Sequence, residues 1–515
     1  MVSPEFSTGV DLVGTLLLQT STGELNEAVR IALGVVTDPL NIGLVVLATL
    51  LGLVMGITPG LGGAITLALL IPITFDLDAN IAIMILAAAL GGTNFGGSVT
   101  AILLNTPGSA PNAATLLDGY PMARQGRAGE AIAASATCSA SGAIIGLALL
   151  VLSVPFIRPI TLAFGSPEFF WLALLGLTVI AVATTGSVVN DLIAGGFGLM
   201  LAFHGLNPVT GTARFTWGSN YLLDGIQLIP AIIGLFALGE MINLVSQRST
   251  IAEAEVVSGG RIKGIRTAVQ NWSLFLRSSL VGWVIGVIPG VGGTVANFVA
   301  YLQAKQTAAD QASFGRGNVK GVIASESAND AKDGGSMLPT LGLGIPGSAS
   351  TAVLLGAFIL HGVTPGPLLF QEDLQLVFII VFSLVISNIL TSIIGLTAIK
   401  PLSQLTRVPI TSLAPVVFVI ALLGAFVLRS NFNDVLLALA FGVFGFAMIK
   451  FNVSRIALVI ALVLGPLAES NFQRSLQISQ GDFGVLFTNP LSIVLIVILI
   501  LVLLLPVRQA INPES

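Results

Sequence analysis

Long apolar stretches recur along this chain and constrain its fold more than any other feature. Residues 491–505 contain almost nothing but aliphatic side chains, and similar runs occupy residues 42–55, 140–154, 169–183, 377–394, 413–427 and 435–449. A helix that crosses the hydrocarbon core of a bilayer needs about 20 such residues. Charged residues make up only 9% of the chain, whereas a soluble domain carries about 25%. We therefore predict an all-α polytopic membrane protein with about 10–14 membrane segments, several of them irregular.

The polar residues indicate how the chain is divided. Lys and Arg are concentrated in loops, and the richest cluster includes Arg261, Lys263 and Arg266 near the middle of the chain. The positive-inside rule places this linker in the cytoplasm. The predicted organisation is an amphipathic N-terminal segment at 1–38, a first membrane repeat at 39–246, a polar cytoplasmic linker at 247–269, a second membrane repeat at 270–507 and a C-terminal tail at 508–515.

The two membrane regions contain the same glycine-rich, proline-broken segment. Gly52-Leu-Val-Met-Gly56-Ile-Thr-Pro59-Gly60-Leu-Gly62-Gly63 aligns with Gly282-Trp-Val-Ile-Gly286-Val-Ile-Pro289-Gly290-Val-Gly292-Gly293, with an offset of 230 at each aligned glycine and at the proline. A second Pro-Gly break follows in each half, at Asn105-Thr106-Pro107-Gly108-Ser109 and at Gly344-Ile345-Pro346-Gly347-Ser348. This order indicates an internal repeat. The residues assigned to the repeat are Gly56, Pro59, Gly60, Gly63, Gly286, Pro289, Gly290 and Gly293.

The glycines and the breaks predict different things. Glycines four residues apart lie on one face of a helix, so Gly52, Gly56 and Gly60 predict a close helix–helix contact. Proline removes a backbone donor, and unpaired backbone groups inside a membrane are costly unless they line a cavity. A symmetric pair of broken helices is therefore typical of a transporter's binding site. We expect Thr106 to be the N-cap and Pro107 the first residue of a half-helix whose positive end suits an anion. The predicted substrate-binding residues are Asn105, Thr106, Pro107, Gly108, Ser109, Gly344, Pro346, Gly347 and Ser348.

Polar residues precede both second breaks. Neutral oxygens and backbone carbonyls of unwound helices are what a sodium ion needs at membrane depth. The predicted ion-binding residues are Thr93, Asn94, Ser98, Asn329 and Asp330. The acidic residues Glu326, Asp330 and Asp333 are functional candidates if they lie inside the membrane. The surrounding stretch, residues 303–336, also holds four basic residues, so a solvated loop is the alternative interpretation.

Other motifs point away from enzymatic chemistry. The chain has no Walker A sequence, and Gly342-Leu-Gly344-Ile-Pro-Gly347 matches a dinucleotide fingerprint outside any strand–helix context. His204 and His361 lack the spacing of metal ligands, and the single cysteine, Cys138, is expected to pack among small residues. Arg214 is interpreted as a helix-end anchor rather than an anion contact. We therefore expect a protein that is not an enzyme, with no catalytic residue and no cofactor beyond a coupling ion.

Longer motifs resemble a known family. The segments Gly56-Ile-Thr-Pro-Gly-Leu-Gly-Gly63, Gly96-Gly-Ser-Val-Thr-Ala-Ile-Leu-Leu-Asn-Thr-Pro-Gly108 and Ala114-Thr-Leu-Leu-Asp-Gly-Tyr-Pro-Met-Ala123 are similar to the large membrane subunit of tripartite tricarboxylate transporters. So are Leu206-Asn-Pro-Val-Thr-Gly-Thr-Ala-Arg-Phe-Thr216, Ile229-Pro-Ala-Ile-Ile-Gly-Leu-Phe-Ala-Leu-Gly-Glu240, Gly344-Ile-Pro-Gly-Ser348 and Gly362-Val-Thr-Pro-Gly-Pro367. The resemblance runs from about residue 40 to 505, nearly the whole chain.

The resemblance implies an importer in the cytoplasmic (inner) membrane of a prokaryote that works by alternating access. It implies two protein partners, a small membrane subunit and an extracytoplasmic solute-binding protein, and no nucleic acid. It also implies uptake of citrate or other small di- and tricarboxylates, driven by an ion gradient that is usually of sodium. The implied fold has two inverted structural repeats with re-entrant hairpins, arranged as a scaffold plus a mobile transport domain. The sequence leaves open whether the subunit forms homo-oligomers.

Three other functions stay open on the sequence alone. One is a stand-alone secondary carrier for another organic anion, and the second is an intramembrane enzyme acting on anionic substrates, which would need a convergent catalytic cluster. The third is a channel, which would conduct without stoichiometric coupling. One departure from the family pattern bears on the site. Where the family usually reads Glu-Ala-Ala-Asn-Asn, this chain has Glu326-Ser-Ala-Asn329-Asp330. Asp330 adds negative charge beside a carboxylate substrate, so an ion or Lys332 is needed to compensate it.

Overall fold

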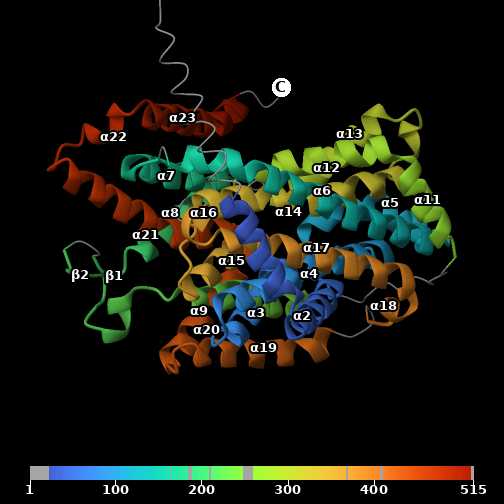
Figure 1. The fold of residues 1–515 in the computed structure, drawn as a ribbon. Helices are drawn as coiled ribbons and strands as arrows, with labels where there is room; N and C mark the ends of the chain where they lie inside the picture. Colours follow the sequence, from blue (N-terminus) through green and yellow to red (C-terminus); the bar gives the residue numbers. More distant parts are fainter. Residues whose placement is uncertain are drawn as a thin grey trace, which may run out of the picture.

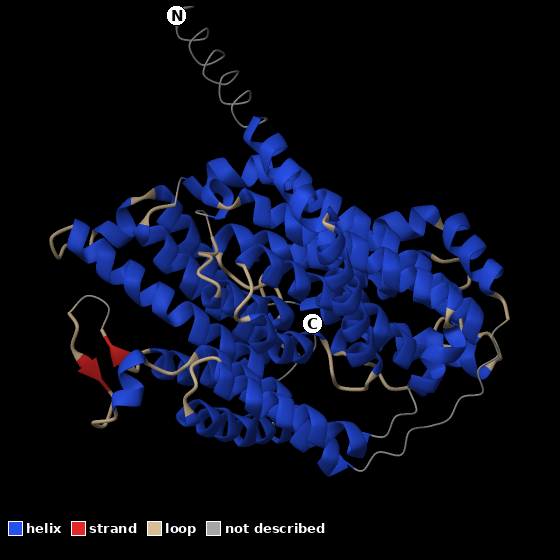
Figure 2. Cartoon of the chain, turned by 60° about the horizontal axis from the view of Figure 1, so that its bottom comes forward, coloured by secondary structure: helices blue, strands red, loops and turns tan. Residues whose placement is uncertain are grey.

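The computed structural model describes residues 23–162, 164–183, 188–207, 210–247, 259–290, 292–366, 369–405 and 410–511. In this part of the chain the regular elements are helices, apart from one short hairpin of β1 (Gly205–Leu206) and β2 (Ala213–Arg214) (Figure 1 and Figure 2). A helix over 23–37 belongs to the predicted N-terminal segment. Residues 1–22 of that segment, 248–258 of the predicted linker and 512–515 of the predicted tail lie outside the described residues.

Seven described helices are long and apolar enough to cross a membrane. They are Pro39–Ile57, Ala79–Leu104, Ala128–Ile157, Leu228–Ser246, Leu374–Thr397, Phe432–Lys450 and Arg455–Ile478. Six shorter apolar helices accompany them, at Gly63–Thr74, Val189–Ala202, Trp272–Val287, Ala349–Leu360, Leu413–Val427 and Pro490–Val502. The predicted class, an all-α polytopic membrane protein, is confirmed. The inversion of the repeats and the motion of a transport domain stay predictions.

Both halves of the chain run through the same order of helices. In each, a long helix, a Pro-Gly break, a second helix, a long polar helix, another break, a shorter helix and a further long helix follow in turn. The first half contains α2 (Pro39–Ile57), α3 (Gly63–Thr74), α4 (Ala79–Leu104), η1 (Ala110–Asn112), α5 (Ala113–Arg124) and α6 (Ala128–Leu162). The second half contains α12 (Trp272–Val287), α13 (Gly292–Thr307), α14 (Val319–Leu343), α15 (Ala349–Leu360) and α17 (Leu374–Thr397).

The other elements follow each half. After α6 come α7 (Ser166–Ala183), α8 (Val188–Ala202), η2 (Asn220–Asp224), α9 (Leu228–Ile232), the π-helical η3 (Ile233–Leu238), α10 (Gly239–Gln247) and, within the predicted linker, α11 (Arg261–Gln270). The second half also holds η4 (Gln311–Ser313), α16 (Leu369–Glu372), α18 (Ile399–Leu405), α19 (Ile410–Val427), α20 (Phe432–Lys450), α21 (Arg455–Ile478), α22 (Val485–Thr488) and α23 (Pro490–Ile511). Helix α23 thus continues past residue 508, where the sequence predicts a tail.

The repeated glycines lie where the backbones of neighbouring helices touch. A Cβ atom on Gly52 would lie 2.1 Å from the carbonyl oxygen of Ala89, so α2 packs directly on α4. The equivalent Cβ on Gly282 would lie 2.5 Å from the carbonyl oxygen of Ala328, so α12 packs in the same way on α14. Without side chains at these positions, two helices can approach closely inside a membrane.

The third glycine of each predicted ridge is not part of the helix, which corrects the sequence analysis. Helix α2 ends at Ile57 and α12 at Val287, so Gly60 and Gly290 lie in the breaks that follow. Their φ angles are 84° and 74°, a left-handed conformation that glycine adopts without strain. The break therefore begins one turn earlier than the glycine spacing indicates, because Pro59 and Pro289 end the ladder of helical hydrogen bonds.

Helices of the two halves pack against one another. Helix α4 packs between α2 of its own half and α17 of the other, and α14 packs between α12 and α6. The short helices cross in the same way, since α15 contacts α3 and η1 contacts α13. Polar helices α4 and α14 are consequently enclosed by protein on several sides.

The helices form two bundles, with α3 and α15 between them (Figure 1). The first bundle consists of α2, α4–α6, α11–α14 and α17, and the second of α7–α10, η3 and α19–α23. Helix α3 contacts α4 in the first bundle and η3 and α19 in the second. Helix α15 contacts α4 and α14 on one side and α21 on the other. The short helices after the breaks therefore connect the bundles.

The sequence leaves two interpretations for residues 303–336, a buried segment or a solvated loop. In the structure, the start of α14 separates a loop from a buried helix. Residues 308–318 form a loop that is fixed by Asp118 of α5, whose Oδ1 accepts hydrogen bonds from the backbone N–H groups of Gly317 and Asn318 at 2.8 and 2.7 Å. From residue 319 onward the chain is helical and enclosed. Glu326, Asp330 and Asp333 are only 0%, 1% and 6% exposed, so these acids are buried rather than part of a solvated loop.

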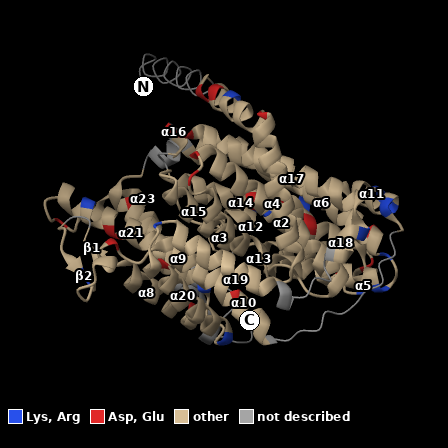
Figure 3. Ribbon diagram, turned by 90° about the horizontal axis from the view of Figure 1, so that it is seen from below, with Lys and Arg blue, Asp and Glu red and all other residues tan. Residues whose placement is uncertain are grey.

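Basic residues gather at the end of the molecule formed by α5 and α11 (Figure 3). Lys263 of α11 lies 3.2 Å from Glu130 of α6, and Arg127 pairs with the same carboxylate at 2.9 Å. The basic loop before α6 and the basic linker are therefore neighbours at one end of the molecule. This arrangement agrees with the positive-inside rule for both.

The glycine contact between α2 and α4 generates a test within one helix. We expect Gly52→Ala to lower the thermal stability of the purified protein, because the new Cβ would overlap the backbone of Ala89 and overpacking costs about 1–3 kcal/mol. Gly43→Ala in the same helix is the matched control, since nothing lies within 4 Å of its Cβ position. Melting curves in detergent compare the two. Equal melting temperatures for both variants would contradict the contact.

Candidate functional site

A cavity of about 570 Å³ lies between the two bundles, and several helices begin at its wall. Helices α3, η1, α13, α15 and α21 start at lining residues, which are Gly63, Ala110, Gly292, Ala349 and Arg455. The N-terminal end of a helix carries free N–H groups and a partial positive charge. Several such ends around one cavity favour a negatively charged ligand.

The structure brings part of the predicted substrate site to this cavity. Of the residues predicted from the second breaks, Pro107, Gly108, Ser109 and Ser348 line it, whereas Asn105, Thr106, Gly344, Pro346 and Gly347 are not among the lining residues. The first breaks also reach it, through Gly60, Gly63 and Gly293. The first breaks therefore do more than allow close packing, because residues of the first and the second breaks both border the cavity.

The expectation that Thr106 caps a half-helix starting at Pro107 is wrong. Helix α4 ends at Leu104 and is followed by Asn105, a C-cap whose φ of 55° is left-handed, and the Thr106 hydroxyl donates back to the carbonyl of Leu104 at 3.3 Å. The next helical residue is Ala110, which follows Ser109. The chain needs the intervening residues to reverse direction, and Gly108 lets the loop pass over Gly97, since a Cβ on Gly108 would lie 2.4 Å from the Gly97 Cα.

The second half reverses direction in the same way and is capped by Ser348. Helix α14 ends at Leu343, and its C-cap Gly344, with a φ of 70°, occupies the position that corresponds to Asn105. The Ser348 hydroxyl accepts a hydrogen bond from the Thr351 N–H at 3.2 Å, and the Thr351 hydroxyl accepts one from the Ser348 N–H at 2.8 Å. This capping box fixes the start of α15 at the cavity wall.

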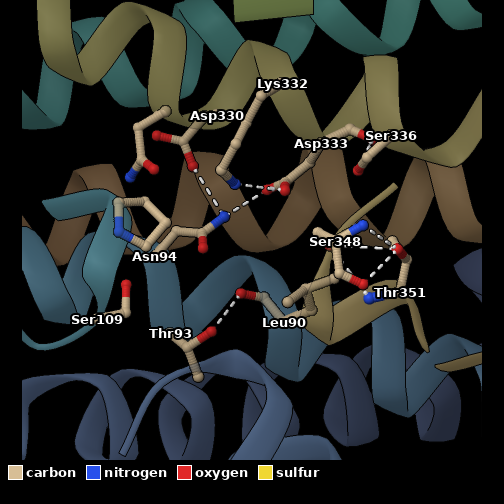
Figure 4. Close-up of polar contacts among 12 residues, drawn as sticks. Leu90, Thr93, Asn94, Ser109, Asp330, Lys332, Asp333, Ser336, Ser348 and Thr351 are labelled. Carbon is tan, nitrogen blue, oxygen red and sulfur yellow. Dashed lines mark hydrogen bonds and ion pairs between the residues drawn. The ribbon is translucent and has the colours of Figure 1, made fainter. Parts of the chain in front are cut away.

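A buried polar network joins the two long polar helices (Figure 4). Lys332 Nζ donates to Asp333 Oδ1 at 2.6 Å within α14. The Asn94 side-chain amide, from α4, donates to Asp330 Oδ1 at 3.3 Å and to Asp333 Oδ2. Asn94, Lys332 and Asp333 line the cavity, while Asp330 is not among the lining residues. Each half thus supplies one side of the network.

Glu326 is held by hydroxyl groups rather than by a cation. Its Oε1 accepts hydrogen bonds from Ser98 at 2.9 Å and from Thr115, and its Oε2 accepts one from Ser135 at 2.8 Å. Asn112 connects this carboxylate to the cavity, because its amide donates to Ser98 at 2.9 Å and its Oδ1 accepts from the lining Ser109 at 2.6 Å. Glu326 therefore lies behind the cavity wall.

The charges of α14 are not balanced inside the described structure. Glu326, Asp330 and Asp333 face one buried ammonium group, Lys332. Asp330 Oδ2 is buried and has no hydrogen-bond partner in this part of the chain. Because an unpaired buried carboxylate is costly, a cation or proton is needed here. Within the described residues, however, no group of three or more His, Cys, Asp and Glu side chains is placed to hold a metal ion.

The predicted ion-binding residues do not all converge. Asn94 and Asp330 are hydrogen-bonded to each other, and Ser98 lies one turn beyond Asn94 on α4. Thr93 instead donates to the carbonyl of Leu90 at 2.7 Å, and the Asn329 Oδ1 accepts from Asn297 at 3.0 Å. The structure therefore brings Asn94 and Asp330 together, whereas the hydroxyl of Ser98 donates to Glu326 and the side chains of Thr93 and Asn329 are hydrogen-bonded elsewhere.

Several lining or connecting residues were missed by the sequence analysis. Asn112, Thr115 and Ser135 carry no signal in a single sequence, since isolated amides and hydroxyls occur in any helix. Arg455 and Glu240 form an ion pair at the cavity wall although they are 215 residues apart. The basic pair Lys450 and Arg455 marks a loop in the sequence, but nothing there distinguishes the residue that faces the cavity.

Arg214 anchors a hairpin rather than the helix end that the sequence predicts, since it lies on β2. Its guanidinium donates to both carboxylate oxygens of Glu469, at 2.5 and 3.0 Å. This hydrogen-bonded pair raises the pKa of Arg214. Arg214 is not among the residues that line the cavity. The pair attaches the β1–β2 hairpin to α21.

Comparisons with known proteins find one matching family and two relatives. The model of the tripartite tricarboxylate transporter TctA family matches residues 42–460. An uncharacterized 52.8 kDa protein of Agrobacterium vitis, from the TAR-I ttuC' 3' region, is 35% identical over 464 residues, which cover 88% of this chain and 90% of that protein. A second uncharacterized protein of Agrobacterium vitis, from the TAR-II ttuC' 3' region, is 36% identical over 211 residues, covering 41% of this chain and 87% of that protein. No solved structure matches the chain significantly.

The Lys332–Asp333 pair makes a prediction about stability. We expect Lys332→Gln to lower the melting temperature strongly, because a buried carboxylate left without its cation costs about 3–5 kcal/mol. The double variant Lys332→Gln/Asp333→Asn removes both charges and should recover most of the loss. Thermal melts of the purified protein measure both effects. A double variant as unstable as the single one would contradict this account of the pair.

Proposed function

Because the chain belongs to the tripartite tricarboxylate transporter TctA family, the large membrane subunits of such systems, we propose that it imports citrate or other small di- and tricarboxylates. Transport is driven by an ion gradient, with sodium as the coupling ion, and proceeds by alternating access. The protein acts as a transporter and not as an enzyme. It works in the cytoplasmic membrane of a prokaryote, with the basic linker on the cytoplasmic side.

One observation carries the proposal. The cavity between the bundles is bordered by the Pro107-Gly108 break, by residues at or just after the other three breaks and by the first residues of several helices. A carboxylate there is attracted by the positive ends of these helices and by Lys332. At the second tip the lining hydroxyl of Ser348 supplies a neutral donor, whereas the Ser109 hydroxyl at the first tip donates to Asn112. A volume of about 570 Å³ accommodates a small polycarboxylate, since ligand pockets commonly measure about 300–1,000 Å³.

The coupling ion is assigned to the neighbourhood of Asp330. This carboxylate has one oxygen bound to Asn94 and another without a partner among the described residues. A sodium ion beside Asp330 compensates its charge and lowers the repulsion between α14 and the substrate carboxylates. The Lys332 side chain compensates Asp333 at the same time. Ion and substrate are thereby linked, because each reduces the electrostatic cost of binding the other.

The position of the cavity supports the proposal of alternating access. Its walls come from both bundles, so a movement of one bundle against the other changes its exposure to the two sides of the membrane. Helices α3 and α15 contact both bundles and shift with such a movement. The partners are a small membrane subunit and an extracytoplasmic binding protein that delivers the carboxylate.

Uptake into proteoliposomes tests the function. We expect [14C]citrate and [14C]succinate to accumulate when the purified membrane complex, the loaded binding protein and an inward sodium gradient are all present. Removing the sodium gradient should reduce the initial rate at least about tenfold, because accumulation then loses its driving force. A potassium gradient of equal size is the control.

Two results would contradict the proposal. Uptake that is unchanged without the binding protein would favour a stand-alone carrier. Absence of citrate and succinate uptake under every gradient, in vesicles that contain correctly assembled complex, would exclude the substrate class.

A further inference from the structure

We propose that Arg455 is a second carboxylate-binding residue of the cavity and that Glu240 occupies it when no substrate is bound. The inference rests on the proposed function and specifies which substrates are accepted. Of the described residues that line the cavity, two carry positive charge, Lys332 and Arg455. Lys332 belongs to α14 of the first bundle and Arg455 to α21 of the second. A ligand with two carboxylates can bind one cation from each bundle.

Arg455 is held in place by more than its acidic partner. Its Nη2 donates to Glu240 Oε2 at 2.8 Å, whereas its Nη1 donates to the carbonyl oxygen of Leu235 at 3.1 Å. The guanidinium carbon also lies 5.5 Å from the centroid of the Phe236 ring, a cation–π distance. Leu235 and Phe236 belong to the π-helical η3, a conformation that is frequent at functional sites. The guanidinium therefore keeps two of its contacts if Glu240 leaves.

Glu240 is held more loosely by Arg455 than Glu469 is held by Arg214. It receives one hydrogen bond from Arg455, and its second oxygen accepts one from Asn243 at 3.2 Å. Glu469, by contrast, receives two hydrogen bonds from Arg214. Planar two-point pairing of this kind is the stronger arrangement. Glu240 can therefore be exchanged for another carboxylate at a lower cost.

Exchange explains how an anion enters a cavity whose charges are already paired. Lys332 pairs with Asp333, and Arg455 with Glu240, so the lining charges sum to zero. A substrate carboxylate that replaces Glu240 leaves Arg455 paired, while Glu240 gives up its cation. Glu240 keeps Asn243 as a donor and turns towards the open cavity. A monocarboxylate reaches one cation only and gains correspondingly less.

The exchange model is tested by removing the charge of Glu240. If Glu240 competes with the substrate, Glu240→Gln should lower the Kd of the purified membrane complex for citrate and succinate at least about threefold, which corresponds to a gain of about 0.7 kcal/mol or more. Arg455→Gln should raise the same Kd at least about tenfold. It should raise the Kd for propionate less, because a monocarboxylate does not need both cations. Direct binding of radiolabelled citrate, succinate and propionate measures all three.

The Arg214–Glu469 pair supplies matched controls. Glu469→Gln and Arg214→Gln remove the same charges from a pair that does not line the cavity, so neither should change the Kd for any of the three acids. Assembly of each variant is checked by size-exclusion chromatography. If Glu240→Gln does not assemble, Glu240→Asp tests the same point, since its shorter side chain weakens the pair and should also lower the Kd.

The possible failures are separable. A Kd for citrate that is unchanged or raised in Glu240→Gln or Glu240→Asp overturns the exchange model, while the proposed function stands if the unmodified complex binds citrate. Equal effects of Arg455→Gln on succinate and propionate overturn the two-cation model in the same way. An unmodified complex that binds and transports none of the acids overturns the proposed function and, with it, this inference.

Discussion

The buried charges of α14 are the constraint on which the rest of the structure depends. Three carboxylates and Lys332 are buried on one helix of a protein in which seven other described helices are long and apolar enough to cross a membrane. A helix of this kind cannot face lipid, so it has to be enclosed by other helices and by donors for its acids. The glycines of α12 and of α6 bring two helices into backbone contact with α14, and the hydroxyls around Glu326 supply the donors.

The same enclosure places the functional groups. Asn94 on α4 reaches the acids of α14 because α4 is itself fixed against α2 by the glycine repeat. Each long polar helix is followed by a left-handed C-cap, Asn105 after α4 and Gly344 after α14. The chain then reverses into a short helix that begins at the cavity. Two copies of one hairpin plan therefore yield a single site between the bundles. Because the two copies are related by symmetry, their helix ends converge on the site. The charges of the site come from residues that differ between the copies.

The sequence predicts the repeat, the membrane class and part of the site, for reasons that lie in local chemistry. Gly52 and Gly282 report a helix contact because only glycine fits against a neighbouring backbone. The start of the half-helix is misplaced at Thr106, because the left-handed turn at Asn105 lengthens the loop in a way that a capping pattern does not reveal. The pairing of Arg455 with Glu240 depends on how α21 and η3 pack, and no periodicity records a contact between residues so distant in the chain.

Protection of the cavity by substrate tests the central claim most directly. The chain has one cysteine, Cys138, which is buried, so a cysteine introduced as Ser350→Cys at the cavity wall can be labelled selectively. The account predicts that saturating citrate, in the presence of sodium, slows labelling of this position with a maleimide. The exposed control Gln311→Cys should be labelled at the same rate with or without citrate. An unchanged labelling rate at position 350, in a variant that still transports citrate, would contradict the placement of the substrate between the hairpin tips.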